Sequence, residues 1–320
     1  MERGYDILAM GRSSIDLYAN EIGAPFTEIK TFSAYVGGSP TNIIVGARRL
    51  GLRAALLTAV GDDLVGDFVL DFLAREGVEA SFSPRKAGRR TSAFMLAIQP
   101  PDKFPIVPYR DNCADLELNI EDVHAAPVAE ARALLVTGSG LSREPSRGAT
   151  RFAAETARAH GGKVVLDLDV RAELWPDPRA YAEQVGALLS LVDVVLGTVE
   201  EVEAVLGASG DSLERGAEEL LTAGPEALVV KRGARSTLVF PRGGGRVEAA
   251  TFPVEVLNVL GAGDAFAGGF LYGYLKGWDW HRAARMGNAC GAIVVTRHGC
   301  ANFMPAEHEA LAFIEQRGGF

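Results

Sequence analysis

Short apolar runs alternate with amphipathic stretches along most of this chain, and no other feature restricts the possible folds so strongly. The apolar runs, each expected to be a buried strand, are residues 5–10, 54–60, 134–137, 164–168, 192–196 and 228–231. The stretches expected to be helices lie between them, at residues 40–50, 65–76, 145–160 and from 178 onward. Repeated strand–helix units predict an α/β fold with a mostly parallel central sheet and helices on both faces.

Two regions interrupt this alternation, and both are rich in β-forming and turn residues without helical periodicity. They are residues 17–36 and 78–109, and they predict a small β lid over the main sheet, with lid segments near 12–36 and 79–110. The C-terminal part is nearly all helical, with helices expected at 263–276, 280–297 and 305–316. No linker rich in proline, serine or charge divides the chain, so residues 1–320 are expected to form a single domain with this lid.

The charge balance and the cysteine count disfavour several classes of protein. Lys and Arg number 32 against 41 Asp and Glu, a formal charge of -9, which argues against binding to nucleic acid or to anionic membranes. No apolar run reaches the ~18 residues that span a bilayer. Cys113, Cys290 and Cys300 form no CxxC pair, which disfavours a zinc site and suits a reducing cytoplasm. An anionic substrate would therefore need a local basic pocket.

The most informative segment is the glycine-rich stretch at 258–269, which reads Asn-Val-Leu-Gly-Ala-Gly-Asp-Ala-Phe-Ala-Gly-Gly. Gly261 and Gly263 free the backbone at the start of an expected helix, and exposed N–H groups at a helix N-terminus bind anions. Asp264 would lie in the first turn, where a carboxylate beside a phosphate suits a base that deprotonates an attacking hydroxyl. A plain glycine-rich helix start, with Asp264 favoured by the helix dipole, is the alternative.

A second group of candidate binding residues lies at the start of the first expected helix. Gly37 and Gly38 would let a ligand contact the backbone, and Asn42 offers a donor and an acceptor to a sugar hydroxyl. Ser39 is expected to cap this helix, with proline at its first position. Asp16, which follows the first strand, is a candidate for pairing with sugar hydroxyls. An ordinary strand–helix turn and a turn aspartate are the alternatives here.

Together these two segments resemble, in order, spacing and C-terminal position, the two signatures of the ribokinase-like (PfkB) sugar kinases. The resemblance covers the whole chain and includes Val-Gly-Asp-Asp at 60–63 and Asp-Leu-Asp-Val-Arg at 167–171, where Asp169 replaces the usual Asn. It implies a bilobal ribokinase-like fold and Mg²⁺-dependent transfer of the γ-phosphate of ATP to a primary hydroxyl. Asp264 would then take the hydroxyl proton. The N–H groups that would hold the developing charge are those of Gly261, Ala262 and Gly263.

The resemblance also implies sites for the nucleotide and for ions. The residues that would build the nucleotide pocket are Lys231, Gly233 and Asn288. Mg²⁺ would be held mainly by phosphate oxygens and water. Glu200 would contribute to the metal site indirectly, because Gly197 replaces the Asn that many members have there. Asn258 stands where the family usually has Asp, which leaves open whether a monovalent cation binds.

Two arginines bear on the substrate class. Arg110 follows an expected lid strand and Arg171 ends a sheet strand, so both are expected to point into one cleft, where a guanidinium matches a carboxylate. A surface salt bridge is the alternative for each. Within the family, the stretches 11–18, 109–115 and 166–171 most resemble the subgroup that phosphorylates 5-dehydro-2-deoxy-D-gluconate in inositol catabolism. The resemblance thus implies a sugar acid as the substrate.

Other functions remain as alternatives. A kinase of the same fold acting on 2-keto-3-deoxygluconate, fructose or a nucleoside would have a similar sequence, since one or two pocket residues can change the substrate. A catalytically silent sugar-binding protein would share the fold but would not need Asp264. A nicotinamide oxidoreductase is disfavoured because Phe266 occupies the third glycine position of GxGxxG. A homodimer formed through an exposed face of the lid is a further expectation, as in many relatives.

Overall fold

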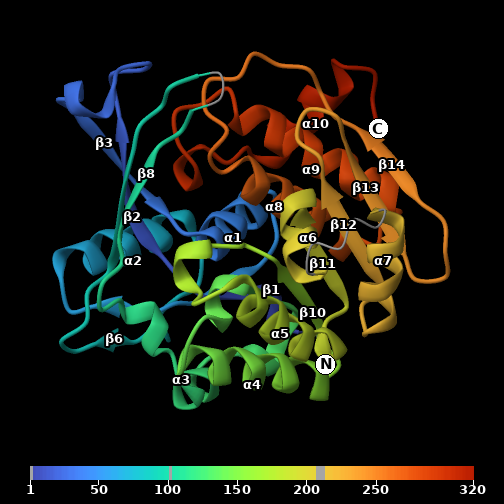
Figure 1. Cartoon of the computed structure of the whole chain (residues 1–320), viewed down its shortest axis with the longest axis horizontal. Helices are drawn as coiled ribbons and strands as arrows, with labels where there is room; N and C mark the ends of the chain where they lie inside the picture. The colour runs from blue at the N-terminus through green and yellow to red at the C-terminus, as the bar shows by residue number, and fades with distance from the viewer. Residues whose placement is uncertain (1–2, 101–102, 207–212) are drawn as a thin grey trace.

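The computed structural model of the chain describes residues 3–100, 103–206 and 213–320. Within them the main sheet has eight strands, in the spatial order β14 (Val247–Ala250), β13 (Ser236–Pro241), β12 (Ala227–Lys231), β11 (Val194–Thr198), β10 (Lys163–Asp167), β9 (Ala131–Thr137), β1 (Tyr5–Met10) and β4 (Ala54–Leu57). The strands from β12 to β4 are parallel, and β13 and β14 pair antiparallel at one edge (Figure 1). The predicted mostly parallel α/β fold is confirmed.

Helices cover both faces of the main sheet (Figure 1). One face carries α1 (Ser39–Arg49), α2 (Leu64–Glu76), α8 (Ala262–Leu275), α9 (Trp280–Val294) and α10 (Glu307–Glu315). The other carries α3 (Ile120–Ala125), α4 (Ser146–Ala159), α5 (Pro178–Leu188), α6 (Val199–Leu206) and α7 (Leu213–Thr222). Because both faces are covered, alternate residues of a strand enter different cores, so Ile7 packs in one and Leu8 in the other. This explains why the strands read as continuous apolar runs.

A second, smaller sheet is formed by the two regions that interrupt the strand–helix alternation. Its strands, in spatial order, are β3 (Phe32–Gly37), β2 (Ser14–Ala19), β7 (Ser92–Leu96) and β8 (Ile106–Tyr109). Two short strands, β5 (Val60–Gly61) and β6 (Arg85–Lys86), pair in parallel with each other. In the sequence they lie between β4 of the main sheet and β7 of the small sheet. Positions 101–102 of the expected lid segment lie outside the described residues. The assignment of the whole chain to one domain with a lid stays a prediction.

The chain crosses from the small sheet to the main body at Gly38, and this crossing fixes the start of α1. Gly38 has φ +100° and is the N-cap residue of α1, so the prediction that Ser39 caps this helix is wrong. A Cβ atom at Gly38 would lie 2.5 Å from the carbonyl oxygen of Arg12. Arg12 lies in the other connection between the two sheets, which joins β1 to β2. Glycine is required here because a side chain would separate the two crossings.

The predicted end of α2 and the predicted start of α5 agree with the structure. α2 ends at Gly77, which has φ +71°, and α5 begins after Asp177, whose carboxylate accepts a bond from the Ala180 N–H at 2.9 Å. The expected strand at 54–60 is instead divided into β4 and β5. No helix in the described parts of the chain is long and apolar enough to cross a bilayer.

Candidate active site

The carboxyl ends of the parallel strands lie on the same side of the main sheet, and α/β folds bind their ligands beside these strand ends. We call this side the carboxyl edge. Arg12 follows β1, Asp169 follows β10, and Lys231 ends β12. The N-termini of α1 and α8 reach the same edge, because Ser39 and Asp264 are in contact there. A cavity of about 460 Å³ lies between this edge and the small sheet. Its polar and aromatic lining includes Arg12, Asp16, Phe94, Asn42, Arg171 and Asp264.

Asp264 lies in the first turn of α8, and donors on α1 fix both of its carboxylate oxygens. Oδ1 accepts a hydrogen bond from Ser39 Oγ at 2.9 Å, and Oδ2 accepts one from Asn42 Nδ2 at 2.7 Å. Burial raises the pKa of Asp264, and the hydrogen bond from Asn42 opposes that rise. Each oxygen keeps a second lone pair. Asp264 can therefore take a proton from a hydroxyl group bound in the cavity.

The glycine-rich turn before α8 has the backbone conformation of an anion site. Gly261 has φ +83° and caps the helix, and a Cβ atom there would lie 2.5 Å from Cys300 Sγ. The N–H groups of Gly261 and Gly263 meet no acceptor among the described residues. The structure differs from the prediction at Ala262, whose N–H donates to the Val259 carbonyl at 3.2 Å. Two of the three predicted N–H groups are thus free to hold a phosphoryl oxygen.

Lys231 adds a positive charge beside this turn. A Cβ atom on Gly263 would lie 3.4 Å from Lys231 Nζ, and the ammonium donates to Asp167 Oδ2 at 3.1 Å. Burial alone would lower the pKa of Lys231, but the Asp167 and Glu201 carboxylates raise it, so Lys231 stays protonated. For Asp167 the signs are opposite: burial raises the pKa of this carboxyl group, and the charge of Lys231 lowers it, with burial the larger effect. The ammonium and the N-terminus of α8 together favour an anion.

The structure brings Glu201, rather than the predicted Glu200, into this cluster. Glu201 Oε2 accepts a bond from the Thr198 N–H at 2.8 Å, and its charge acts on Lys231 and Arg171. Glu200 is exposed at the start of α6. Successive helical residues point about 100° apart, so a one-residue difference turns the side chain away from the strand ends.

Asp16 lies on the inner face of the small sheet, where it lines the cavity. Its Oδ1 accepts a bond from Ser14 Oγ at 2.7 Å, and burial raises its pKa to about 6. Gly37 lies on the neighbouring strand, and a Cβ atom there would come within 2.0 Å of Asp16 Oδ2. The glycine predicted for close ligand approach therefore makes room for this carboxylate. Asp16 is placed to accept hydrogen bonds from substrate hydroxyls.

These raised pKa values predict a pH dependence. As the pH falls through about 6, Asp16 takes up a proton, and kcat/KM for the sugar should fall about tenfold per pH unit on the acid limb. The folded state binds the Asp16 proton more tightly than the unfolded chain, so this titration stabilises the protein as the pH falls. A pH–rate profile with subsaturating sugar tests this expectation. A flat profile between pH 7 and pH 5 would contradict it.

The structure separates the two arginines predicted to bind a carboxylate. Arg171 lines the cavity, with its Nη2 3.0 Å from Asp169 Oδ1. Arg110 does not line it, and its Nη2 is 2.7 Å from Asp115 Oδ2 in a buried pair. Arg12, which the sequence analysis missed, lines the cavity instead. Its place directly after a parallel strand is the signal that could have identified it.

The residues predicted for the nucleotide pocket differ in their surroundings. Gly233 lies in the turn between β12 and β13 with φ +59°, and a Cβ atom there would meet nothing within 4 Å. Asn288 is buried in α9, where its Oδ1 accepts from Thr237 Oγ1 at 2.7 Å. Its Nδ2 donates to the carbonyls of Ala249 and Ala250 at 3.1 and 3.0 Å. Asn288 therefore joins α9 to β13 and β14, and its contact with nucleotide stays a prediction.

The side chain of Asn258 is engaged in hydrogen bonds with two backbone groups. Its Nδ2 donates to the His298 carbonyl at 3.2 Å, and its Oδ1 accepts from the Leu260 N–H at 3.0 Å. This buried amide is neutral, so Asn258 supplies no negative charge to a cation, and its Nδ2 occupies the His298 carbonyl oxygen.

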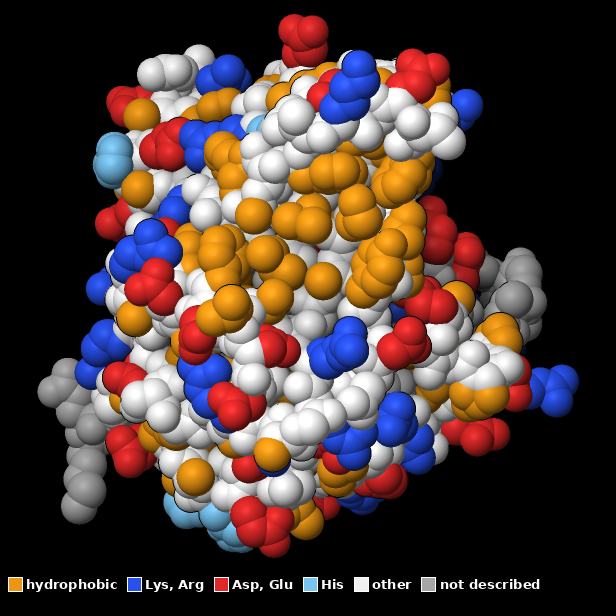
Figure 2. All heavy atoms as spheres, turned by 90° about the vertical axis from the view of Figure 1, so that its left-hand side faces the viewer, with side chains coloured by type: hydrophobic (Ala, Val, Ile, Leu, Met, Phe, Trp, Pro, Cys, Tyr) orange, Lys and Arg blue, Asp and Glu red, His pale blue; other side chains and the backbone are white. Residues whose placement is uncertain are grey.

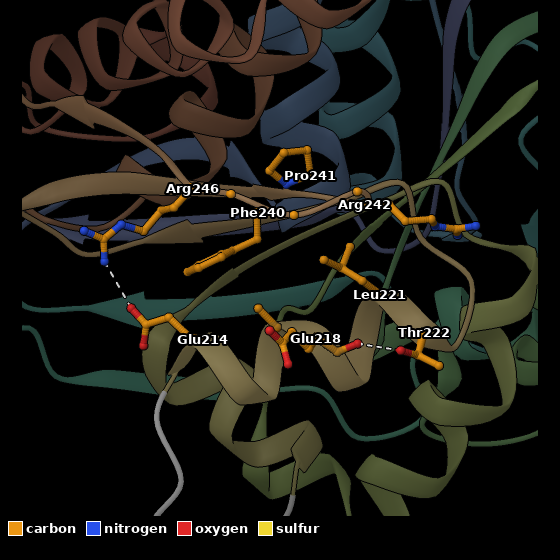
Figure 3. Close-up of a pocket in the computed structure, with 12 residues that line it drawn as sticks. Glu214, Glu218, Leu221, Thr222, Phe240, Pro241, Arg242 and Arg246 are labelled. Carbon is orange, nitrogen blue, oxygen red and sulfur yellow. Dashed lines mark hydrogen bonds and ion pairs between the residues drawn. The ribbon is translucent and has the colours of Figure 1, made fainter.

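A larger hollow, of about 790 Å³, lies elsewhere, between α7 and the turn joining β13 to β14 (Figure 3). Glu214 and Arg246 pair across it at 3.0 Å. Because β13 runs antiparallel to β12, this turn lies beside the amino-terminal end of β12, whereas Lys231 lies at the carboxyl end of that strand. None of the residues predicted for catalysis or binding lines this hollow, so we take the smaller cavity as the candidate active site despite the larger volume of the hollow.

Comparison with known proteins identifies the family of this chain. Residues 5–307 match the family described as pfkB family carbohydrate kinase. The chain is 35% identical to the 5-dehydro-2-deoxygluconokinase of Shouchella clausii, over 98% of this chain and 96% of the relative.

Two solved structures share the fold. A fructokinase with bound ATP from Xylella fastidiosa has a TM-score of 0.87 and 27% identity, covering 97% of this chain and 98% of that one. A double mutant of the Vibrio cholerae fructokinase, with fructose, ADP and potassium bound, has a TM-score of 0.86 and 27% identity, covering 98% and 99%. The chain therefore belongs to the pfkB family of carbohydrate kinases, and it is an ATP-dependent sugar kinase.

Proposed function

We propose that this kinase phosphorylates the primary hydroxyl of a sugar acid, converting 5-dehydro-2-deoxy-D-gluconate to its 6-phosphate in inositol catabolism. The observation that carries the proposal is a cavity containing both Asp264 and the guanidinium groups of Arg12 and Arg171. A neutral sugar needs no such cations, whereas a carboxylate matches them in charge and shape. The name of the Shouchella clausii relative supports the same substrate.

Asp264 acts as the general base in this proposal. It removes the proton of the attacking hydroxyl while the new oxygen–phosphorus bond forms and the bond to the departing ADP breaks. Burial raises the pKa of Asp264, which makes its carboxylate a stronger proton acceptor. The N–H groups of Gly261 and Gly263, with the ammonium of Lys231, stabilise negative charge on the transferred phosphoryl group.

A divalent cation, Mg²⁺ in our proposal, would neutralise charge on the phosphate oxygens. Among the described residues no three His, Cys, Asp or Glu side chains are grouped as a metal site. The metal would be held mainly by phosphate oxygens and water in this proposal. Asp167 and Glu201, whose carboxylates lie near Lys231, would contact it through water.

The substrate is tested by measuring ADP release with a panel of purified compounds. The panel contains 5-dehydro-2-deoxy-D-gluconate, 2-keto-3-deoxygluconate, fructose, ribose and adenosine, each at several concentrations with saturating ATP and Mg²⁺. We expect the highest kcat/KM for 5-dehydro-2-deoxy-D-gluconate and poor activity with the neutral compounds. A higher kcat/KM for fructose, ribose or adenosine would exclude the sugar-acid proposal. A higher kcat/KM for 2-keto-3-deoxygluconate would keep a sugar acid as the substrate but would exclude 5-dehydro-2-deoxy-D-gluconate as the preferred one.

We also propose a homodimer formed through the outer face of the small sheet. Strand residues alternate between faces, and those opposite the cavity side are apolar: Leu17, Ala34, Met95 and Val107 are cross-strand neighbours. Figure 2 shows hydrophobic side chains gathered over a broad area of this side of the molecule. Exposed apolar patches of this kind mark protein interfaces. Sedimentation equilibrium of the wild type and of Met95→Glu tests this, and a wild-type monomer at micromolar concentration would disprove it.

A further inference from the structure

Arg12 has unused hydrogen-bond donors on the wall of the cavity. Its side chain is 7% exposed. Its Nη2 is 3.2 and 3.3 Å from the two carboxylate oxygens of Asp169. Nε is buried without a partner, and Nη1 has no acceptor among the described residues. Nε has no exposed surface, so Nη1 is the donor that a ligand in the cavity can reach, and it gains from an acceptor supplied by that ligand.

Asp169 orients both arginines of this wall. Its carboxylate also accepts a bond from Ser139 Oγ at 2.7 Å and lies 3.0 Å from Arg171 Nη2. Burial alone would raise the pKa of Asp169, but Arg12 and Arg171 hold it below its usual range, so the carboxylate is ionised. The two guanidinium groups share this one carboxylate, and Asp264, Glu201 and Glu173 also act on Arg171. The cationic side chains that line the cavity, Arg12 and Arg171, therefore lie together on this wall.

The other charged side chains that line the cavity repel a carboxylate. The remaining charged residues that line it, Asp16, Glu173 and Asp264, are acidic. The Arg12 guanidinium also faces the ring of Phe94 on β7, with its carbon 5.8 Å from the ring centroid. Arg12 is thus held between Asp169 of the main sheet and Phe94 of the small sheet. A carboxylate in this cavity is attracted to one wall.

We infer that Arg12, positioned by Asp169, binds the carboxylate of the sugar acid. This inference rests on the proposed function and names the residue that selects an acid over a neutral sugar. Arg171 is half-exposed, with 45% of its side chain accessible, so water screens its charge more than that of Arg12. Arg12 is therefore the stronger determinant of the two.

The test compares Arg12→Ala and Arg12→Lys with the wild type. Arg12→Ala should raise KM for 5-dehydro-2-deoxy-D-gluconate about 10- to 150-fold, the usual value of a hydrogen bond to a charged group, with little change in KM for ATP. Arg12→Lys keeps the charge but loses the planar fork, so its KM should lie between the two. Calorimetric binding of the acid without ATP should weaken in parallel. For fructose, kcat/KM should not fall in either variant.

Arg158→Ala is the matched control. Arg158 also pairs with an aspartate, Asp193, at 3.2 Å, but on the surface and outside the cavity. Its removal should leave KM for the acid unchanged. Asp169→Asn weakens the positioning of Arg12, so it should raise KM for the acid more than it lowers kcat.

The possible results separate this inference from the proposed function. If the wild type phosphorylates the acid and neither Arg12 variant changes its KM or its calorimetric Kd, the assignment of Arg12 is overturned while the proposed function stands. If the wild type does not phosphorylate the acid, the proposed function fails and the inference fails with it. Should Arg12→Ala not fold, as judged by circular dichroism, the KM of Arg12→Lys decides.

Discussion

Replacing Asp264 with Asn should lower kcat by about 10²- to 10⁴-fold, the usual contribution of a positioned general base. The amide keeps the size of the carboxylate and can still accept the hydrogen bond from Ser39, but it cannot take the hydroxyl proton. Asn42 Oδ1 is buried without a partner, so rotating the Asn42 amide lets it accept from the new side chain. The variant should therefore fold and bind both substrates.

The measurement is kcat from coupled ADP release, with calorimetric Kd values for the sugar acid and for ATP. Asp67→Asn is the matched control, because Asp67 also lies in the first turn of a helix but pairs with Arg85 at the surface. That variant should keep wild-type turnover. Near-wild-type turnover in Asp264→Asn would remove Asp264 from the role of base.

Replacing Gly263 with Val should lower kcat by about 10²- to 10³-fold, similar to the loss of one donor in an oxyanion hole. Gly263 lies in the first turn of α8, with Lys231 Nζ only 3.4 Å from the place of its Cβ atom. The two methyl groups of valine would extend further into the space where a phosphoryl oxygen meets the ammonium and the free N–H groups. The loss should appear in phosphate transfer rather than in folding.

Gly186→Val is the control for this second variant. Gly186 is also a helical glycine, in α5, and a Cβ atom there would meet nothing within 4 Å. Both variants should give wild-type circular dichroism spectra, and only Gly263→Val should lose activity. Full activity in Gly263→Val would place the phosphoryl site elsewhere.

Local chemistry explains which features could be predicted from the sequence. The strand at 5–10 and the helix that ends at Gly77 follow from short-range patterns: a continuous apolar run, and a glycine in the left-handed conformation. Asp264 and Asn42 could be selected because each lies within a short motif. The strands β13 and β14 were not predicted, because their pairing follows from the contacts of β13 with β12 and of β14 with β13 rather than from a periodic pattern.

The sequence by itself determined the α/β class, and it was enough to propose the glycine-rich anion site and Asp264 as the base, since turn and helix-start chemistry depends on neighbouring residues. Tertiary structure decided which distant side chains share the cavity. Arg110 and Arg12 are both arginines beside cleft motifs, yet Asp115 draws Arg110 into a buried pair while Asp169 holds Arg12 on the cavity wall. Glu201 differs from Glu200 only by its direction on α6. Such orientations depend on partners far away in the chain, and only the packed strands and helices bring those partners together.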